Sequence, residues 1–211
     1  IHKTTDTWGG NMQVDLSGDV RAATPADWRQ LADITAEAFA DDPVNKWIFG
    51  NSRAIKSAFT VLAREIYAKR GECYLAGNGG AAMWCTSDMD RSLSTLPLLS
   101  LAAGVMRWGG KGAVKRAITA GEVMDANHPH EPHMYLFTIG TRKAARGKGL
   151  GKALIRPVLE ACDREGLSAY LENSNPDNTG FYMSHGFEHM KLFEVGEGAP
   201  PLEAMWRKPR M

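Results

Sequence analysis

Residues 138–152 read T-I-G-T-R-K-A-A-R-G-K-G-L-G-K, and this stretch decides how the rest of the chain is interpreted. An apolar run at 134–137 precedes it, and a helical pattern of apolar residues begins near Leu150. Between them, glycines on alternate positions let the backbone approach a bound group closely and adopt positive φ. The N-terminus of the following helix adds unpaired N–H groups and the positive end of its dipole. The stretch therefore predicts a cradle for a polyanion, most simply a pyrophosphate. A glycine-rich connection with solvated lysines is the alternative for this motif alone.

The composition is that of one ordinary domain: 211 residues, 44% of them hydrophobic, are enough for a core of its own. The net charge is +1, so the basic cluster of the glycine loop is local and no nucleic-acid partner is expected. Three scattered cysteines favour neither a disulfide framework nor a zinc site, and a reduced, cytoplasmic protein is expected. The longest apolar stretch, 93–106, is shorter than the roughly 20 residues that cross a bilayer, so no membrane partner is expected.

The N-terminal segment 1–17 is set apart from the rest of the chain. It lacks the apolar centre of a secretory signal and does not begin with Met. We interpret it as a leader or as a segment added by cloning, and we expect residues 18–211 to form a single domain.

Asp41 and Asp42 stand just before Pro43, where the first helix of this domain is expected to end. Two carboxylates at that point could border a cleft, and a solvated helix end is the alternative. The helix begins with Thr24 as N-cap and Pro25 at its first position. The other elements expected in this half are a strand at 20–23, a helix at 52–69, a hairpin of strands at 72–76 and 81–85, and a helical segment at 87–121 that Pro97 and glycines break into pieces.

Three histidines and a glutamate fall within six positions at 128–133, which makes a metal site a hypothesis to weigh. Pro129 and Pro132 hold the segment extended, and alternate side chains of an extended chain point in opposite directions. The side chains therefore cannot all converge on one ion without a sharp turn, and no metal is expected. His133, just before the central strand, is instead a candidate for the edge of a cleft.

Glu172 is the carboxylate at the end of a buried strand expected at 168–172. The helix before this strand, 150–166, contains Pro157, which removes one backbone hydrogen bond and predicts a bend. Beyond the strand, the sequence predicts a short helix that carries Tyr182 and ends at Gly186, and then strands at 187–195 and 202–207. This order predicts an α/β fold with a mixed sheet, opened at the C-terminal ends of strands, where a ligand would lie.

Two motifs in the second half resemble those of the GNAT superfamily of acyl-CoA N-acyltransferases. Residues 146–151, R-G-K-G-L-G, match its [RQ]-x-x-G-x-[GA] signature, and residues 171–187 read L-E-N-S-N-P-x-N-x-x-F-Y-x-x-H-G-F. With H-P-H-E-P-H at 128–133, the pattern is similar to the puromycin-acetyltransferase-like branch. The resemblance implies the GNAT fold, a mixed, mostly antiparallel sheet of about six or seven strands flanked by helices and splayed at the acyl-CoA site, in a monomer or homodimer.

The resemblance also implies where acetyl-CoA would bind. The strand before the loop would pair its backbone with the pantetheine arm, and the N–H groups of the loop would hold the pyrophosphate. Asn178 is larger than the alanine usual at its position, which leaves its contact open. The residues implied in cofactor binding are Ile139, Gly140, Thr141, Arg146, Gly147, Lys148, Gly149, Leu150, Gly151, Lys152, Asn175, Asn178 and Tyr182.

Tyr182 occupies the general-acid position of the family, where a phenol protonates the departing thiolate. A tyrosine packed between helix and sheet is the alternative. Glu172 is the first candidate for the base that deprotonates the acceptor, His133 the second and the pair Asp41 and Asp42 the third, and these four are the candidate acceptor-binding residues. A chain of water molecules is equally admissible.

The function implied is transfer of an acetyl group from acetyl-CoA to a primary amine by direct attack in a ternary complex. Among the cysteines only Cys162 falls within the matched segment, on the apolar side of a helix, so a covalent route is not expected. The acceptor is expected to be a small molecule. A catalytically silent acyl-CoA-binding or interaction domain is the alternative.

Overall fold

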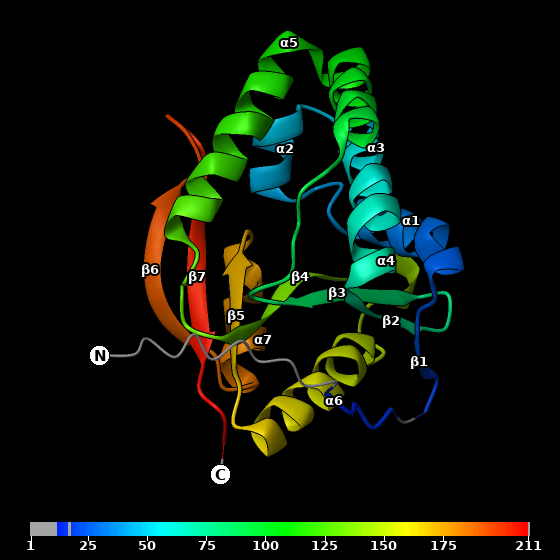
Figure 1. Ribbon diagram of the computed structural model, residues 1–211, viewed down its shortest axis with the longest axis vertical. Coiled ribbons are helices and arrows are strands. Elements are labelled where there is room, and N and C mark those ends of the chain that lie inside the picture. The colour runs from blue at the N-terminus through cyan, green and yellow to red at the C-terminus, as the bar shows by residue number, and fades with distance from the viewer. Residues whose placement is uncertain (1–11, 17, 211) are drawn as a thin grey trace.

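The computed structural model describes residues 12–16 and 18–210, and in this part of the chain seven strands form one sheet (Figure 1). Their order is β1-β2-β3-β4-β5-β7-β6, and neighbours are antiparallel except β4 and β5, which are parallel. The α/β fold with a mixed, mostly antiparallel sheet is therefore confirmed. The strands are β1 Val20–Ala22, β2 Glu72–Ala76, β3 Gly80–Thr86, β4 His133–Thr141, β5 Ser168–Asn173, β6 Glu188–Glu194 and β7 Pro201–Arg207.

Helices lie on both faces of this sheet, with α6 and α7 on one face and α1, α3 and α5 on the other (Figure 1). Within the described residues, none of them is both long and apolar enough to cross a membrane. The helical segments are a 3₁₀ turn Pro25–Asp27, α1 Trp28–Ala38, α2 Pro43–Phe49, α3 Ser52–Leu62, a π-helical turn Ala63–Tyr67, α4 Ala68–Arg70, α5 Thr95–Asn127, a 3₁₀ turn Lys143–Ala145, α6 Leu150–Glu165, a 3₁₀ turn Pro176–Asn178 and α7 Thr179–Ser184.

The parallel pair β4–β5 is hydrogen-bonded along only part of its length. The paired residues run from His133 and Ser168 to Leu136 and Leu171. Beyond this point β4 continues along β3, and β5 continues along β7. The sheet therefore opens between the C-terminal halves of its two central strands.

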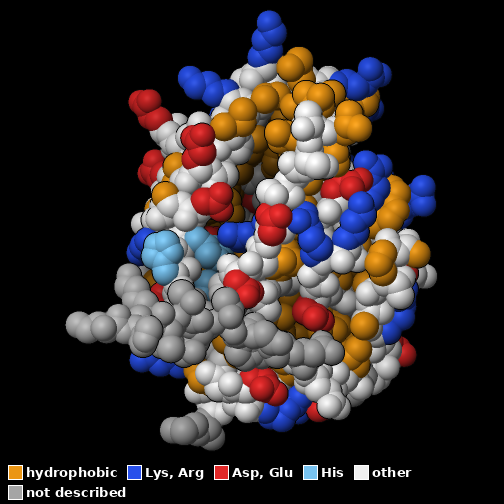
Figure 2. Space-filling model, in the orientation of Figure 1, with side chains coloured by type: hydrophobic (Ala, Val, Ile, Leu, Met, Phe, Trp, Pro, Cys, Tyr) orange, Lys and Arg blue, Asp and Glu red, His pale blue; other side chains and the backbone are white. Residues whose placement is uncertain are grey.

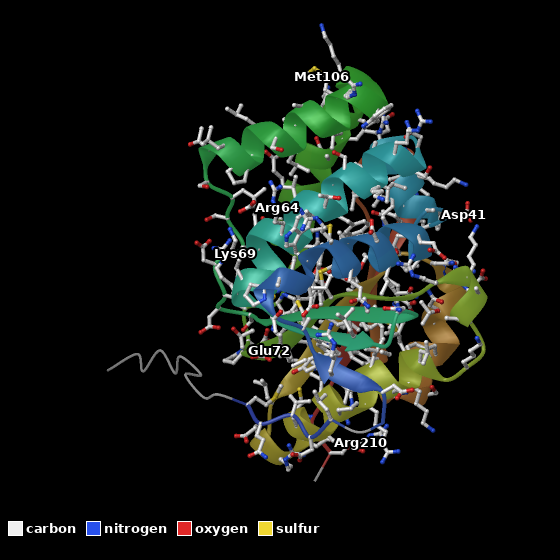
Figure 3. All side chains as sticks on the ribbon, turned by 90° about the vertical axis from the view of Figure 1, so that its right-hand side faces the viewer. Asp41, Arg64, Lys69, Glu72, Met106 and Arg210 are labelled. Carbon is white, nitrogen blue, oxygen red and sulfur yellow. The ribbon has the colours of Figure 1, made fainter. Side chains whose placement is uncertain are left out.

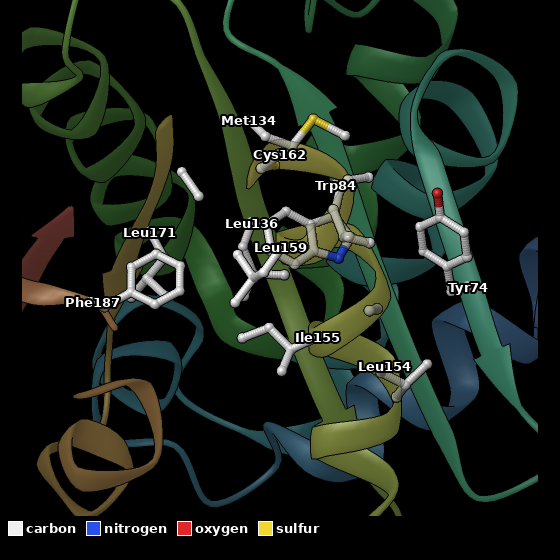
Figure 4. Packing of buried hydrophobic residues seen from close by; sticks show 14 of the residues in the cluster. Tyr74, Trp84, Met134, Leu136, Leu154, Ile155, Leu159, Cys162, Leu171 and Phe187 are labelled. Carbon is white, nitrogen blue, oxygen red and sulfur yellow. The ribbon is translucent and has the colours of Figure 1, made fainter. Parts of the chain in front are cut away.

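The core on the α6 face fixes the position of that helix against the sheet. Trp84 of β3 and Leu136 of β4 are buried against Ile155 of α6 (Figure 4). Gly80 of β3 allows a close approach, since a Cβ at this position would lie only 2.9 Å from Cδ1 of Leu154. The first turn of α6 is thereby held beside the open end of β4.

On the opposite face, α1 lies directly on β4. A Cβ added to Gly140 would lie 2.5 Å from Cβ of Ala38, so only glycine permits this approach. The residues that follow α1, Asp41 and Asp42, are consequently held next to the opening of the sheet.

Prolines interrupt the helices less than the sequence led us to expect. Pro97 falls in the first turn of α5, where its missing N–H has no intrahelical partner. The predicted break at Pro97 is therefore wrong, whereas the predicted break at a glycine is confirmed at Gly110 (φ 78°), whose non-helical backbone divides α5 into two helical halves. Pro43 begins α2, with Asp42 as its N-cap. Pro157 lies inside α6, which continues on both sides of it.

Of the predicted leader, residues 1–11 and 17 lie outside the described residues. The described part, 12–16, packs on the domain: Met12 is buried in the core of the α6 face, and Val14 and Leu16 contact the same cluster. The carbonyl oxygen of Gln13 accepts a hydrogen bond from Arg164 of α6. Residues 12–16 thus contribute to the core of the domain.

A charged pair joins α6 to β7 at the base of the sheet. Nη1 and Nη2 of Arg207 each donate to a carboxylate oxygen of Asp163 at 2.7 Å, and the Arg207 side chain is only 3% exposed. Burial alone would raise the pKa of Asp163, but hydrogen bonds from Arg207 and from the N–H of Arg210 outweigh it and lower this pKa. The stabilisation is therefore present above the ordinary pKa of aspartate and is lost as the pH falls through the lowered value.

We predict that Asp163→Asn lowers the free energy of unfolding by about 2–3 kcal/mol at neutral pH, because it leaves the Arg207 guanidinium buried without its charge partner. Urea denaturation measures the change. Glu160→Gln is the control, since Glu160 pairs with Arg156 on the exposed side of the same helix and should cost less than about 1 kcal/mol. Equal losses of unfolding free energy in the two variants would show that the buried Asp163–Arg207 pair stabilises the fold no more than an exposed pair.

Candidate active site

A cleft of about 430 Å³ lies at the open end of the sheet, beside the glycine loop. The end of β4, the first turn of α6, α7 and the segment after α1 enclose it. Lys148 and Lys152 are absent from its lining and are exposed, whereas Asp41 and Asp42 belong to it. The other predicted cofactor residues all line the cleft: Ile139, Gly140, Thr141, Arg146, Gly147, Gly149, Leu150, Gly151, Asn175, Asn178 and Tyr182.

The glycine loop has the backbone that its sequence predicts. Gly147 and Gly149 have φ values of 75° and 76°, in the left-handed region that favours glycine, and Gly149 is the N-cap of α6. A Cβ at either position would meet no atom of the described residues within 4 Å, so both glycines face open space there. The N–H groups in the first turn of α6 have no partner within the helix. Together these features leave room and hydrogen-bond donors for an anion.

Charge is distributed unevenly around the loop. Arg142 pairs with Glu37 of α1, and Lys143 pairs with Asp41 at 2.7 Å. These pairs connect the start of the loop to the end of α1, and Figure 3 shows Asp41 at that outer edge of the molecule. Within the described residues, no carboxylate pairs with the three basic residues nearer α6, which are Arg146, Lys148 and Lys152. The loop therefore keeps positive charge for a ligand.

Tyr182 of α7 reaches the inner end of the cleft. Its side chain is 8% exposed, and burial first, then the charge of Asp42, raises the pKa of its hydroxyl above the ordinary value. Asp42 is itself buried, which raises the pKa of its carboxyl although Ser174 and Asn45 donate hydrogen bonds to it. Tyr182 therefore remains protonated at neutral pH and can donate a proton.

A second cavity, of about 280 Å³, lies on the opposite face of the sheet, beneath α5. Figure 2 shows a hollow in this region with hydrophobic side chains in it. Phe39 lines both cavities, and Oγ of Ser174, in the second cavity, donates to Asp42, in the first, at 2.5 Å. The two cavities thus meet at the opening between β4 and β5.

Glu172 lines the second cavity and not the cleft. Its side chain is 3% exposed, and Oε2 accepts a hydrogen bond of 2.7 Å from the hydroxyl of Tyr135. Among the described residues, Oε1 has no hydrogen-bond donor, and Nδ1 of His128 is the nearest basic nitrogen, at 3.6 Å. The carboxylate is therefore buried beside an apolar cavity, and one of its oxygens accepts no hydrogen bond from the described residues.

His133 lies away from both cavities, at the first residue of β4. It is buried and lines a third, more open cavity of about 670 Å³, which includes His128. Burial lowers the pKa of His133 to about 4, so it is a neutral and weak base at physiological pH. His133 is connected to Glu172 through His128. The Nε2 atoms of His133 and His128 are 3.1 Å apart, and Nδ1 of His128 lies near Glu172.

Two of the three histidines therefore meet, which the extended-chain interpretation did not anticipate. His128 follows directly on α5 as its C-cap, so its side chain follows the geometry of the helix end and turns toward His133. His130 is exposed. Within residues 12–16 and 18–210, no three histidine, cysteine or acidic side chains are arranged to hold a metal ion.

The sequence interpretation missed Ser174, Phe39 and Tyr135 as parts of the site. Ser174 lies inside the quoted motif at 171–187, but it contacts Asp42, which is 132 residues away in the sequence. Tyr135 contacts Glu172 across the paired part of β4 and β5. The only local signal for these contacts in the sequence was Glu172, a polar residue at the end of a buried strand.

The sequence pattern of the acetyltransferase (GNAT) family matches residues 105–187, which include β4, the glycine loop, α6 and α7. A Schizosaccharomyces pombe protein described as an uncharacterized N-acetyltransferase is 29% identical over 200 residues, covering 87% of this chain and 80% of that protein. A Corynebacterium glutamicum structure, described as histone acetyltransferase HPA2 and related acetyltransferase, is also 29% identical. It has a TM-score of 0.65, covering 93% of this chain and 98% of that one.

More distant structures share the fold. Arylalkylamine N-acetyltransferase 2 of Aedes aegypti is 10% identical with a TM-score of 0.59, over 92% of this chain and all of that one. The family pattern, the two relatives and the open sheet with its glycine loop agree. The chain is an acetyltransferase of the EC 2.3.1 type, and its residues 105–187 carry the pattern of the acetyltransferase (GNAT) family.

We predict that acetyl-CoA raises the melting temperature of the wild-type protein and that Gly149→Val abolishes this shift, because the new side chain fills the space left for phosphate. Differential scanning fluorimetry measures both. Gly166→Val is the matched control: Gly166 caps the other end of α6, has φ 65° and also faces open space. Both variants should lower the melting temperature of the free protein through backbone strain. A full acetyl-CoA shift in Gly149→Val would remove the loop from the binding site.

Proposed function

We propose that the protein transfers an acetyl group from acetyl-CoA to a small primary amine by direct attack in a ternary complex. The meeting of two chemically different cavities at the open end of β4 and β5 supports this reaction. The cleft on the α6 side offers backbone donors and the basic side chain of Arg146, whereas the cavity beneath α5 is apolar with one carboxylate. Two substrates can therefore approach the same point from opposite faces of the sheet.

The residues of the cleft fit acetyl-CoA in charge and in space. Open space at Gly147 and Gly149, the first turn of α6 and the charge of Arg146 suit the pyrophosphate. Beyond Leu136, no described residue pairs with β4 on its β5 side, so the backbone of 139–141 is free to pair with the pantetheine amides as with an added strand. Asn175 and Asn178 line the same cleft and would flank this arm.

Tyr182 would act as the general acid of the reaction. The amine nitrogen forms a bond to the acetyl carbonyl carbon, and the bond from that carbon to sulfur breaks with its electron pair on sulfur. Tyr182 donates a proton to this sulfur, since its hydroxyl is protonated at neutral pH and the residue lines the cleft. The products are an N-acetylated amine and the free thiol of coenzyme A.

Glu172 would accept the proton that must leave the ammonium form of the acceptor before the nitrogen can attack. A second proton leaves the nitrogen as the amide forms and restores Tyr182 through solvent, so the reaction releases one proton in all. His128, 3.6 Å from Glu172, lines the third cavity and offers an exit for the released proton. In this proposal His133 contacts His128 and has no direct contact with Glu172, and the carboxylate of Asp42 orients the hydroxyl of Ser174.

The cysteines support direct attack over a covalent acetyl-enzyme. All three are buried, and burial raises their pKa values, to about 12 for Cys85 and Cys162. A thiol with such a pKa supplies almost no thiolate at neutral pH. None of the three lines either cavity.

The resemblance of residues 128–133 and 171–187 to the puromycin-acetyltransferase-like branch supports a small-molecule acceptor. The alternative, a silent acyl-CoA-binding domain, is distinguished by turnover. Free thiol released from acetyl-CoA is followed over a panel of primary amines, and release that depends on an amine supports the enzyme. Binding of acetyl-CoA without release for any amine would favour the silent domain.

We predict that Tyr182→Phe lowers kcat by roughly 10²–10⁴-fold while the KM for acetyl-CoA changes little, because the ring and its packing remain and only the proton donor is lost. Steady-state thiol release measures both constants. Tyr74→Phe is the control, since Tyr74 is another buried tyrosine of the same core cluster, and its hydroxyl contacts Glu72 outside the site. A wild-type kcat in Tyr182→Phe would make Tyr182 a packing residue.

A further inference from the structure

The cavity beneath α5 is lined almost entirely by apolar side chains. They come from elements distant in sequence: Phe39 follows α1, Val44 and Ile48 lie in α2, and Met124 lies in α5. Aromatic rings form one wall, with Phe39 and Phe59 5.5 Å apart and Phe59 and Phe137 6.3 Å apart. A ligand held here would bury an apolar body of its own, preferably one with a flat ring.

Charge in this cavity is confined to one group. Among the described residues that line it, only Glu172 carries a charge, and Asn45, Tyr135, Thr138 and Ser174 supply the polar atoms. A second positive charge on a ligand would therefore be buried without a partner, and a carboxylate or phosphate would meet no basic side chain. These facts favour a ligand with a single positive charge and exclude polyamines and zwitterions as preferred ligands.

Glu172 is placed to receive that single charge. Tyr135 fixes one carboxylate oxygen, and the other has no donor within the part of the chain that the structure describes. The residue lies on β5 one position beyond Leu171, the last residue paired with β4, which is where the sheet opens toward the cleft. An ammonium ion at Glu172 thus lies at the junction of the two cavities, with its apolar body beneath α5.

We propose that the acceptor is a monocationic primary amine carried on an apolar, ring-containing body, of the arylalkylamine type. This inference rests on the proposed function, because it assigns the acceptor of that reaction. The cavity volume of about 280 Å³ limits the body to one or two rings. The contact of the body with the aromatic wall and α5 selects the substrate, and Glu172 orients its nitrogen.

The test compares 2-phenylethylamine with two acceptors that lack one of its features. Ethanolamine has the same ammonium group on a polar body, and spermidine has additional charges. We expect kcat/KM for 2-phenylethylamine to exceed that for either by about tenfold to 100-fold, which is the range for burying one ring. A ratio of one or less would overturn the inference while the observed turnover upholds the proposed function.

Variants of α5 connect this preference to the cavity. Ala117 lines it, and Ala117→Phe should lower the preference for 2-phenylethylamine over ethanolamine at least about tenfold. Ala103→Phe adds the same ring to an exposed position in the half of α5 before Gly110, outside the lining, and should keep the wild-type preference. Met124→Gln changes polarity at nearly constant size and should also reduce the preference, which keeps the test valid if Ala117→Phe fails to fold. An unchanged preference in both lining variants would overturn the inference.

If no amine is acetylated, the proposed function fails and binding alone decides the inference. 2-Phenylethylamine should then raise the melting temperature more than ethanolamine and more than its uncharged analogue 2-phenylethanol. Glu172→Gln should remove the advantage of the amine over the alcohol, because the charge partner is gone. Equal shifts for the three compounds in the wild-type protein would contradict the inference.

Discussion

The site depends on one feature of the sheet, which is that β4 and β5 stop pairing after Leu136 and Leu171. If the pairing continued, the backbone of 139–141 would be satisfied by β5 and the two faces of the sheet would be sealed from each other. Because it stops, one strand edge faces the cleft, and Glu172 of β5 and Ser174, just after β5, line the cavity beneath α5. Both cavities, and the point at which they meet, follow from this opening.

Packing on both faces maintains the opening. On one face, Gly80 lets α6 lie close to β3, and on the other, Gly140 lets α1 lie close to β4. Each helix then delivers its polar end to the cleft: the N-terminus of α6 with its unpaired N–H groups, and the residues after α1 that include Asp42. Burying the carboxylate of Glu172 is costly, and the hydrogen bond from Tyr135 offsets part of that cost. A monocationic ligand would offset more of it.

Much of the fold could be predicted, because most elements carry local signals. The hairpin of β2 and β3, the limits of α6 and the positive φ of Gly149 and Gly166 follow from periodicity and from glycine chemistry. The passage of α5 through Pro97 could not, because a proline is a breaker in a helix interior but harmless in a first turn, and the start of the helix at Thr95 was not evident.

The candidate site was predictable on one side only. The cofactor side is built from consecutive residues around the glycine loop, so a motif describes it. The cavity beneath α5 is assembled from α2, α3, α5, β4, β5 and β7 together with Phe39 and Ser174, and most of its lining residues are ordinary apolar residues of their own elements. The meeting of His128 with His133 likewise depends on where α5 ends in space. No local pattern encodes such contacts.

A conjugate of the two proposed substrates tests the central claim most directly. Coenzyme A joined through its sulfur and an acetyl bridge to 2-phenylethylamine spans both cavities only if they meet between β4 and β5. Isothermal titration calorimetry should find it bound at least about 100-fold more tightly than coenzyme A alone, since the linked phenylethyl group, attached through an amide, binds at a high effective concentration. That gain should disappear in Ala117→Phe and persist in Ala103→Phe. An affinity equal to that of coenzyme A in the wild-type protein would contradict the account, because it would show that the cavities do not form one site.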